Sequence, residues 1–246
     1  MSEPRHASSP AGAQPLEVAG ELLLLLPDRA VAWPARRTLV VADIHFGKDD
    51  VFRRAGLAIP EGAATEDLER LARLLAATRC ERLLVLGDFV HGRVAPGDAF
   101  PPRFARWRAA HRELAIVVVA GNHDRHLLGG GGGDADATHL EVAWHRGALL
   151  EAPFAFVHDP GTPEFDAPRA PFTLSGHVHP VARLPVPGGT SVRVPAFWQR
   201  PDGLVLPAFG RMTGGQVVRP APGERLFAAG PERVRALRLP AHDPAV

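Results

Sequence analysis

Five short segments of the sequence combine aspartate, asparagine and histidine in ways that suit metal binding. They are Asp43-Ile44-His45, Gly87-Asp88, Gly121-Asn122-His123-Asp124, His158 and Gly176-His177-Val178-His179. Each follows a short apolar run that predicts a β-strand. In an open α/β sheet, ligands bind beyond the carboxyl ends of the strands. We therefore expect the five segments to converge on one crevice.

The spacing within two of these segments suits a grip on one ion. Asp43 and His45 stand two residues apart, as do His177 and His179. In extended backbone, such residues point to the same side of the chain, so we expect each pair to act together. Three of the segments place a glycine before a candidate ligand, which lets the backbone turn sharply and approach an ion closely.

The donor set indicates the kind of ion. The candidate ligands are Asp43, His45, Asp88, Asn122, His158, His177 and His179. Oxygen and imidazole donors without a thiolate suit Mn²⁺, Fe or Zn²⁺ better than Ca²⁺. Seven ligands are too many for one tetrahedral ion, and they match two ions that share a carboxylate. A lone Asp-x-His pair would be a weak signal, whereas five segments in order, each after a strand, are far more specific.

These motifs resemble those of the calcineurin-like metallophosphoesterase superfamily over residues 43–179. A closer likeness covers about residues 16–240 and rests on Val41–Lys48, Ala58–Gly62 and Leu204–Gly210. Through these segments the sequence resembles the ligase-associated PdeM-type proteins, a family of DNA damage response endonucleases found near genes for ATP-dependent DNA ligases and helicases.

The resemblance implies an α/β fold, a four-layer αββα sandwich with two mixed β-sheets flanked by helices. It also implies two divalent metal ions, with Mn²⁺ favoured and Fe or Zn²⁺ as alternatives. One ion would be held by Asp43, His45, Asp88 and His179, and the other by Asp88, Asn122, His158 and His177. Asp88 would then bridge the two ions.

Three further residues, His123, His91 and Asp124, are candidates for catalytic roles, and two of them also have a purely structural alternative. By the resemblance, His123 lies over the phosphate and donates a proton to the leaving oxygen. His91 belongs to a Gly-Asp-x-x-His pattern that is similar to the nuclease branch of the superfamily. It either orients His123, touches the phosphate or merely lines the cleft. Asp124 either polarises this neighbourhood or caps the following turn through its carboxylate.

The elements that must position these residues are short. Apolar runs predict strands at Thr38–Ala42, Leu83–Leu86, Ile116–Ala120, Phe154–Val157, Phe172–Leu174, Ser191–Val194 and Leu204–Phe209, and a hairpin at Leu22–Leu26 and Ala30–Trp33. Helical spacing of apolar residues predicts helices over Glu61–Arg79 and Pro102–Leu114. We expect a disordered tail at 1–15, a single domain at 16–240, a short tail at 241–246 and a surface loop at Gly129–Gly133.

Composition excludes several classes of protein. The chain has 246 residues, of which 46% are hydrophobic, so it can build a core and is not a disordered chain. The formal net charge of +1 excludes a generally basic coat for nucleic acid, although not a local basic groove. Cys80 is the only cysteine, which excludes a disulfide framework. No apolar run approaches the 20 or so residues of a membrane span, so we expect a cytoplasmic protein without a membrane partner.

The leading functional hypothesis is a metal-dependent phosphodiesterase that acts as an endonuclease on single-stranded or damaged DNA. Ligase and helicase proteins are the expected repair partners, and a homodimer is an open alternative. A phosphodiesterase or phosphomonoesterase for small molecules such as nucleotides is the alternative enzyme, and a non-catalytic repair scaffold is the alternative outside enzymes. Arg93 and Arg125 could contact phosphate, and Trp198 could either stack on a base or pack inside the fold.

Overall fold

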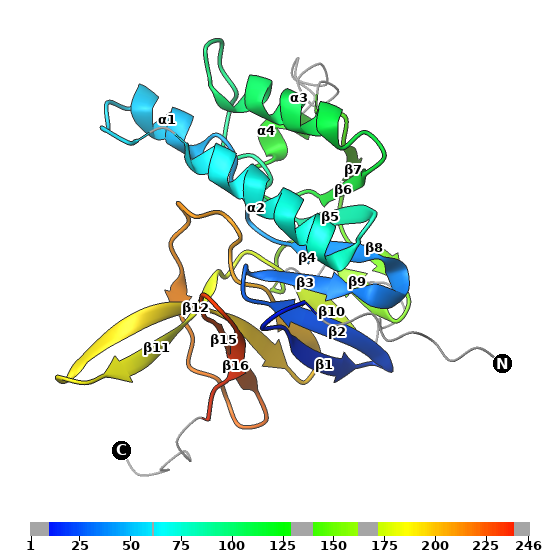
Figure 1. The fold of residues 1–246 in the computed structure, drawn as a ribbon, viewed down its shortest axis with the longest axis vertical. Helices are drawn as coiled ribbons and strands as arrows, with labels where there is room; N and C mark the ends of the chain where they lie inside the picture. The colour runs from blue at the N-terminus through cyan, green and yellow to red at the C-terminus, as the bar shows by residue number, and fades with distance from the viewer. Residues whose placement is uncertain (1–9, 61, 129–139, 162–171, 239–246) are drawn as a thin grey trace.

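The computed structural model describes residues 10–60, 62–128, 140–161 and 172–238. Two mixed β-sheets stack on each other, and helices cover the outer face of the first (Figure 1). The α/β fold with two mixed sheets and helices is therefore the one predicted. None of the described helices is long and apolar enough to cross a membrane.

The first sheet has seven strands in the order β1-β2-β3-β4-β5-β6-β7. They are β1 (Gln14–Val18), β2 (Glu21–Leu26), β3 (Ala30–Trp33), β4 (Thr38–Val41), β5 (Arg82–Leu86), β6 (Ala115–Val119) and β7 (Ala143–His145). The strands β1 to β4 form an antiparallel meander, whereas β4 to β7 run parallel. The parallel strands therefore deliver their carboxyl ends to the same edge of the sheet.

The second sheet has nine strands. They are β8 (Leu149–Glu151), β9 (Phe154–Phe156), β10 (Phe172–Ser175), β11 (Pro180–Val186), β12 (Thr190–Arg200), β13 (Gly203–Val205), β14 (Gln216–Val217), β15 (Arg225–Ala229) and β16 (Val234–Ala236). At its centre, β9, β10 and β13 run parallel, and most of the other pairs are antiparallel. Their parallel direction brings the ends of β9 and β10 together.

The core lies in two layers. One apolar layer fills the space between the two sheets, and large side chains such as Trp33, Phe154 and Phe197 are fully buried there. The other layer lies between the first sheet and its helices. Each large apolar side chain buried in this way contributes about 1.5–3 kcal/mol relative to its exposed state. This double core fixes the two sheets against each other, so loops from both sheets can share one site.

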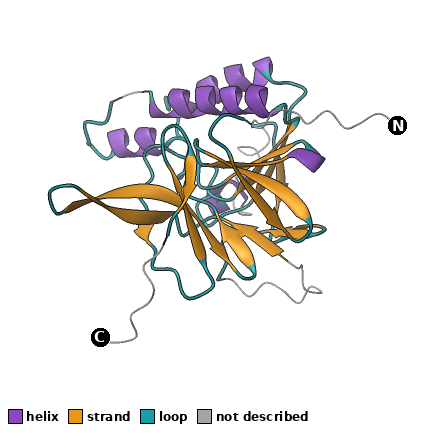
Figure 2. Cartoon of the chain, turned by 60° about the horizontal axis from the view of Figure 1, so that its bottom comes forward, coloured by secondary structure: helices purple, strands orange, loops and turns teal. Residues whose placement is uncertain are grey.

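The helices are short and all lie between residues 34 and 128 of the described chain (Figures 1 and 2). They are η1 (Pro34–Arg36), α1 (Lys48–Arg54), α2 (Ala63–Thr78), α3 (Phe100–Ala110) and α4 (Arg125–Leu128). The helix α2 follows the predicted apolar spacing, since Leu68, Leu71 and Leu75 are buried. The predicted helix at Pro102–Leu114 is shifted, because α3 begins at Phe100 and ends at Ala110.

Some predicted features lie outside the described residues. This is true of Gly129–Gly133, of residues 241–246 and of most of the tail expected at 1–15. The last two residues of that tail, Gln14 and Pro15, belong to β1 and pair with β2. The tail prediction fails there because Pro15 stands in the edge strand of the sheet, where proline is tolerated.

Candidate active site

The structure brings all seven candidate ligands together at the ends of five strands. The strands β4, β5 and β6 of the first sheet and β9 and β10 of the second each run into one of the five segments. Hydrogen bonds continue from the strands into these loops. His45 N–H donates to the Asp88 carbonyl over 2.8 Å, and Gly176 N–H donates to the His158 carbonyl over 2.9 Å. The structure therefore brings the five segments together in one place, as expected.

One group of side chains is formed by Asp43, His45 and His179. Their ligand atoms lie within 4.8 Å of one another. His179 Nε2 is 3.3 Å from Asp43 Oδ1, and the Asp43 side chain is wholly buried. Asp88 lies beside this group, with its Oδ2 3.7 Å from His45 Nε2.

A second group adjoins the first and shares Asp88 with it. Asp88 Oδ2 is 3.6 Å from His158 Nε2. The same His158 nitrogen is 2.9 Å from Asn122 Oδ1 and 3.1 Å from His177 Nδ1. Four polar atoms that can each accept a hydrogen bond or bind a cation thus point at one spot.

The protonation of His158 shows whether a metal ion fits this group. Its Nδ1 lies 3.1 Å from the Leu86 carbonyl, which can only accept, so Nδ1 carries the proton. The lone pair on Nε2 therefore faces the side chains of Asp88, Asn122 and His177. A metal-ligating histidine is commonly held in this tautomer by a backbone carbonyl. The residues present therefore fit a cation at this place.

The first group passes a similar test. His179 Nε2 is buried and makes no hydrogen bond among the described residues, although Asp43 Oδ1 lies 3.3 Å away. An unpaired buried nitrogen costs about 1–3 kcal/mol, and coordination of a cation would remove that cost. Burial, and next the charge of Lys48, lowers the pKa of His45 to about 2, which keeps its ring in the neutral form that binds metal ions.

Two glycines allow the carboxylates to sit this close to the backbone. A Cβ atom at Gly121 would lie 2.3 Å from Asp88 Oδ1, and one at Gly176 would lie 2.6 Å from Asp43 Oδ2. No side chain fits in either place. Backbone amides close to these glycines bind the two carboxylates. His123 N–H donates to Asp88 Oδ1 and His177 N–H donates to Asp43 Oδ2, each over 2.9 Å.

The expectation of extended backbone within the two i, i+2 pairs is wrong. Both members of each pair, and the shared aspartate as well, have positive φ angles: Asp43 (53°), His45 (54°), Asp88 (49°), His177 (67°) and His179 (50°). Non-glycine residues are uncommon in this left-handed region. Strain of this kind persists only where the surroundings impose it, and it clusters at functional sites. The chain turns sharply at these five ligands, and as a result His177 lies beside His158 whereas His179 lies beside Asp43.

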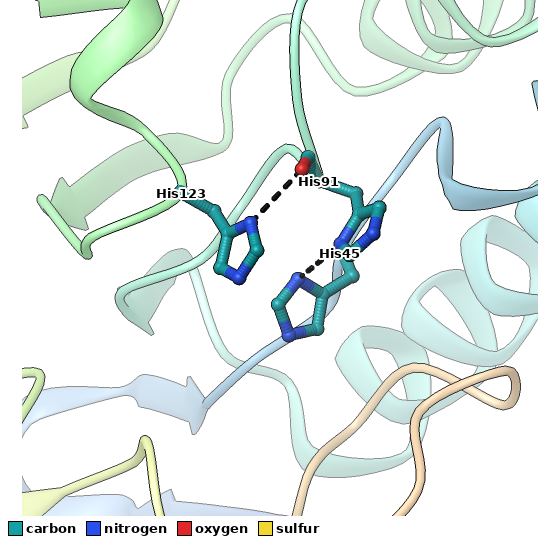
Figure 3. Close-up of side chains that lie close together, drawn as sticks. All are labelled: His45, His91 and His123. Carbon is teal, nitrogen blue, oxygen red and sulfur yellow. Dashed lines mark hydrogen bonds between the residues drawn. The ribbon is translucent and has the colours of Figure 1, made fainter. Parts of the chain in front are cut away.

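His45, His91 and His123 form a third cluster at the edge of the site (Figure 3). His123 Nδ1 donates to the backbone carbonyl of His91 over 3.0 Å, and the two rings are stacked with centroids 4.8 Å apart. His91 Nδ1 lies 3.2 Å from His45 Nδ1. Burial first, and then Lys48, lowers the pKa of His91 to about 4. The ring and carbonyl of His91 thus hold His123 in place.

Asp124 is fully buried and faces backbone amides rather than the metal-binding side chains. Its carboxylate accepts hydrogen bonds from Gly121 N (2.9 Å), Val90 N (3.0 Å) and Phe89 N (3.3 Å). Burial raises its pKa, which these hydrogen bonds partly offset. The carboxylate thereby ties the loop after β5 to the loop after β6, where Asp88 and Asn122 stand.

The motifs of the sequence did not indicate two residues that lie near the site, Lys48 and Asp159. Lys48, the only lysine of the chain, begins α1 directly behind His45, and burial lowers its pKa. Asp159 Oδ2 lies 3.6 Å from His177 Nε2. Lys48 ends the Val41–Lys48 motif and Asp159 follows His158, so position next to a motif was the signal available in the sequence.

The remaining candidates lie apart from these clusters. Arg93 and Arg125 are exposed, and neither contacts a candidate ligand among the described residues. Trp198 packs in a small apolar cluster, and its indole N–H donates to Glu224 over 2.9 Å. The packing alternative therefore describes Trp198 better than base stacking.

Comparison with known families identifies the class of protein. The model of the calcineurin-like phosphoesterase family matches residues 36–167, which include His45, Asp88, Asn122 and His158. The chain belongs to this family, and it is a metal-dependent phosphoesterase. The family uses a dinuclear metal site, and the clusters above provide candidate residues for one.

Solved structures narrow the relationship. The chain is 40% identical to a nuclease called MPE from Pseudomonas putida, with a TM-score of 0.73, and the match covers 92% of this chain and 100% of that one. The phosphoesterase YfcE of E. coli matches at 17% identity with a TM-score of 0.44, over 80% of this chain and 95% of that one. A comparison with curated protein sequences finds no significant match.

Proposed function

We propose that this protein is a dinuclear-metal phosphodiesterase that cleaves DNA as an endonuclease. The observation that carries the proposal is the pair of adjoining donor groups that share Asp88. The likeness to a nuclease at 40% identity over nearly the whole chain supports a nucleic acid as substrate. Hydrolysis of a phosphodiester bond is a reaction that suits both the two donor groups and the nuclease relative.

The assignment of ligands follows the two groups. Asp43, His45 and His179 would hold one ion, Asn122, His158 and His177 the other, and Asp88 both. We favour Mn²⁺ on the resemblance to the PdeM-type family, and Fe or Zn²⁺ are the alternatives, since oxygen and imidazole donors suit all three. Two bound cations supply an activated water at neutral pH and neutralise the phosphate oxygens.

His123 would act on the leaving oxygen. Its Nδ1 is occupied by the His91 carbonyl (Figure 3), so Nε2 is the atom that can transfer a proton. General-acid help of this kind contributes about 10²–10⁴ in rate. His91 positions His123 through its carbonyl and its stacked ring, and Asp124 positions the loops through their amides.

The charge beside the catalytic histidine favours diesters over monoesters. A phosphomonoester carries about one more negative charge near neutral pH, because its second pKa is about 6. Phosphatases of the Ser/Thr type have the pattern Gly-Asp-x-Val-Asp-Arg-Gly, but here His91 and Gly92 stand where that pattern has Asp and Arg. Fewer fixed positive groups then meet the extra charge of a monoester.

The cellular role is proposed on the resemblance. PdeM-type proteins are ligase-associated, so we place the activity in DNA repair on single-stranded or damaged DNA, with ligase and helicase proteins as partners. Hydrolysis of small nucleotides by the same site is the alternative activity.

The test compares three substrates with Mn²⁺-loaded protein. We expect kcat/KM for bis-p-nitrophenyl phosphate to exceed that for p-nitrophenyl phosphate, and a circular single-stranded DNA to be opened, which requires an internal cut. A preference for the monoester without DNA cleavage would contradict the proposal and favour the nucleotide phosphatase. No turnover of any substrate would favour a scaffold.

A further inference from the structure

A hollow opens beside the candidate active site, on the side of His179. It has a volume of about 300 Å³, and His179 forms part of its wall. Its lining includes three arginines, Arg29, Arg193 and Arg211, and no acidic residue among the described part of the chain. We call it the arginine cleft. Its volume lies at the lower end of the range for small-ligand sites, about 300–1,000 Å³.

The three arginines come from separate parts of the chain. Arg29 lies in the turn between β2 and β3, Arg193 lies on β12, and Arg211 follows β13. Burial lowers the pKa of Arg29, the carboxylates of Asp67 and Asp28 raise it in part, and the charge of Arg211 lowers it further, so the Arg29 and Arg211 guanidinium groups lie near each other. Cations gathered in one hollow are the usual arrangement for binding an anion, and guanidinium groups match phosphate well.

Arg29 is half-buried, faces Asp67 and donates to the Ala208 carbonyl over 3.4 Å, whereas the partners of the two exposed arginines leave them available. Arg211 Nη1 pairs with Glu66 over 2.7 Å, but both side chains are more than half exposed, at 57% and 54%. Such surface pairs contribute at most about 1 kcal/mol, so a phosphate can replace Glu66. Arg193 donates to the Gly215 carbonyl and has no carboxylate partner among the described residues.

The loop that carries Arg211 is fixed to the candidate metal ligands by its backbone. Phe209 N–H donates to the Ala42 carbonyl over 2.8 Å, and Gln216 N–H donates to the His179 carbonyl over 3.0 Å. Between them, a Cβ atom at Gly210 would lie 2.1 Å from the Ile44 carbonyl oxygen, so the loop lies directly on the Asp43–His45 turn. The position of Arg211 relative to the site is thereby set by the fold.

We propose that the arginine cleft binds backbone phosphates next to the scissile phosphodiester of a nucleic-acid strand. This inference rests on the proposed function and adds the path of the strand to it. No phenylalanine, tyrosine or tryptophan is found among the described lining of the cleft, so apart from the candidate ligand His179 it offers no platform for stacking bases. Contacts made to phosphates carry no sequence information, so the cleft adds no sequence preference to cleavage.

A hollow on the side of His158 differs in charge from the arginine cleft. It has a volume of about 330 Å³, and its lining includes Asp159, Asp202 and a single arginine, Arg200. Asp202 pairs with Arg200 over 3.3 Å, so Asp159 leaves this hollow with a net negative charge that repels a polyanion, whereas the arginine cleft attracts it.

Binding of a fluorescein-labelled single-stranded oligonucleotide to metal-loaded protein tests the proposal, with anisotropy read before cleavage. The double variant Arg193→Gln/Arg211→Gln removes two exposed arginines. We expect its Kd to rise at least tenfold. We also expect the slope of log Kd against log salt to fall by about 1.4, since each phosphate contact on a single strand contributes about 0.7. The control Arg112→Gln alters an exposed arginine of a hollow that shares no residue with the cleft.

Each result decides the question. Unchanged Kd and salt slope in the double variant, an equal loss in Arg112→Gln, or no binding by the unaltered protein would overturn the proposal. If the double variant has a lowered Tm, Arg193→Gln alone tests the proposal, with an expected rise in Kd and a change in the salt slope of about 0.7. If the unaltered protein binds through the cleft but never cuts DNA, the proposed nuclease function fails while the cleft stands.

Discussion

The loops from the two sheets contribute to the same site but are held in different ways. On the first-sheet side, Asp43, Asp88 and Asp124 are almost wholly buried, and backbone hydrogen bonds join their loops to one another. On the second-sheet side, the His177 and Asp159 side chains are 42% and 37% exposed. The carboxylates of the first side are therefore held in a preformed frame, whereas His177 and Asp159 of the second side face the solvent from which a substrate arrives. Two ligand candidates depart from this division, because His158 is buried and Asn122 is exposed.

This difference separates residues that hold the site from residues that meet ligand or solvent. Buried carboxylates with several hydrogen bonds cannot be removed without loss of structure, because their partner amides are left unpaired. Exposed side chains can be removed with little effect on folding. Substitutions on the two sides should thus differ in kind as well as in size.

The largest effect is expected at Asp88, where the two donor groups meet. In Asp88→Ala we expect metal content to fall from two ions per chain to one or none, and kcat/KM for bis-p-nitrophenyl phosphate to fall about 10⁴-fold, because stabilisation of the phosphate charge is lost. Elemental analysis and steady-state kinetics measure both. Asp88→Asn, which keeps the bond from His123 N–H, serves as the control for folding. Two ions retained in both variants would exclude a shared ligand.

His123 tests whether the first-sheet side also holds a residue that acts without binding metal. In His123→Ala we expect two ions to remain and turnover to fall about 10³-fold, within the range for a lost general acid. His126→Ala is the matched control, because His126 is an exposed histidine three residues along the chain. Loss of metal with a normal rate per bound ion would assign His123 to the ligands instead.

The smallest expected effect is on the free energy of unfolding, which should differ between substitutions on the two sides. Asp124→Ala leaves the amides of Gly121, Phe89 and Val90 without an acceptor, and we expect a loss of about 3 kcal/mol or more in the free energy of unfolding. Asp159→Ala, the same change on the exposed side, should cost less than about 0.5 kcal/mol. Urea unfolding measures both. Equal losses would mean that the frame does not depend on the Asp124 carboxylate.

The same two sides differ in how far the sequence predicted them. Three parallel strands of the first sheet were anticipated at Thr38–Ala42, Leu83–Leu86 and Ile116–Ala120, because they are continuous apolar runs, but β1 and β7 of the same sheet were not predicted. The helix α1 was missed, since Lys48–Arg54 is mostly charged. In the second sheet, β12 extends well past the predicted Ser191–Val194 and its partner β11 was not predicted, because polar and proline residues pair there as readily as apolar ones.

The membership of the site was visible in the sequence, but its geometry was not. Every candidate ligand stands beyond the end of a strand, which is a local pattern. The left-handed turns at residues such as Asp43 and His177 depend on contacts with distant segments, and no local preference indicates them. The arginine cleft is hidden for the same reason, since Arg29 and Arg211 become neighbours only when the sheets stack.

The backbone contact between the Phe209–Gly210 loop and the Ala42–Asp43 turn also bears on how the protein is made. The first candidate ligands are synthesised well before the loop that lies on them. Contacts between segments so far apart form slowly, because a long stretch of chain must close before they can stabilise anything. A nascent chain therefore exposes Asp43 and His45 without their backbone partner until the loop at Phe209 has been made.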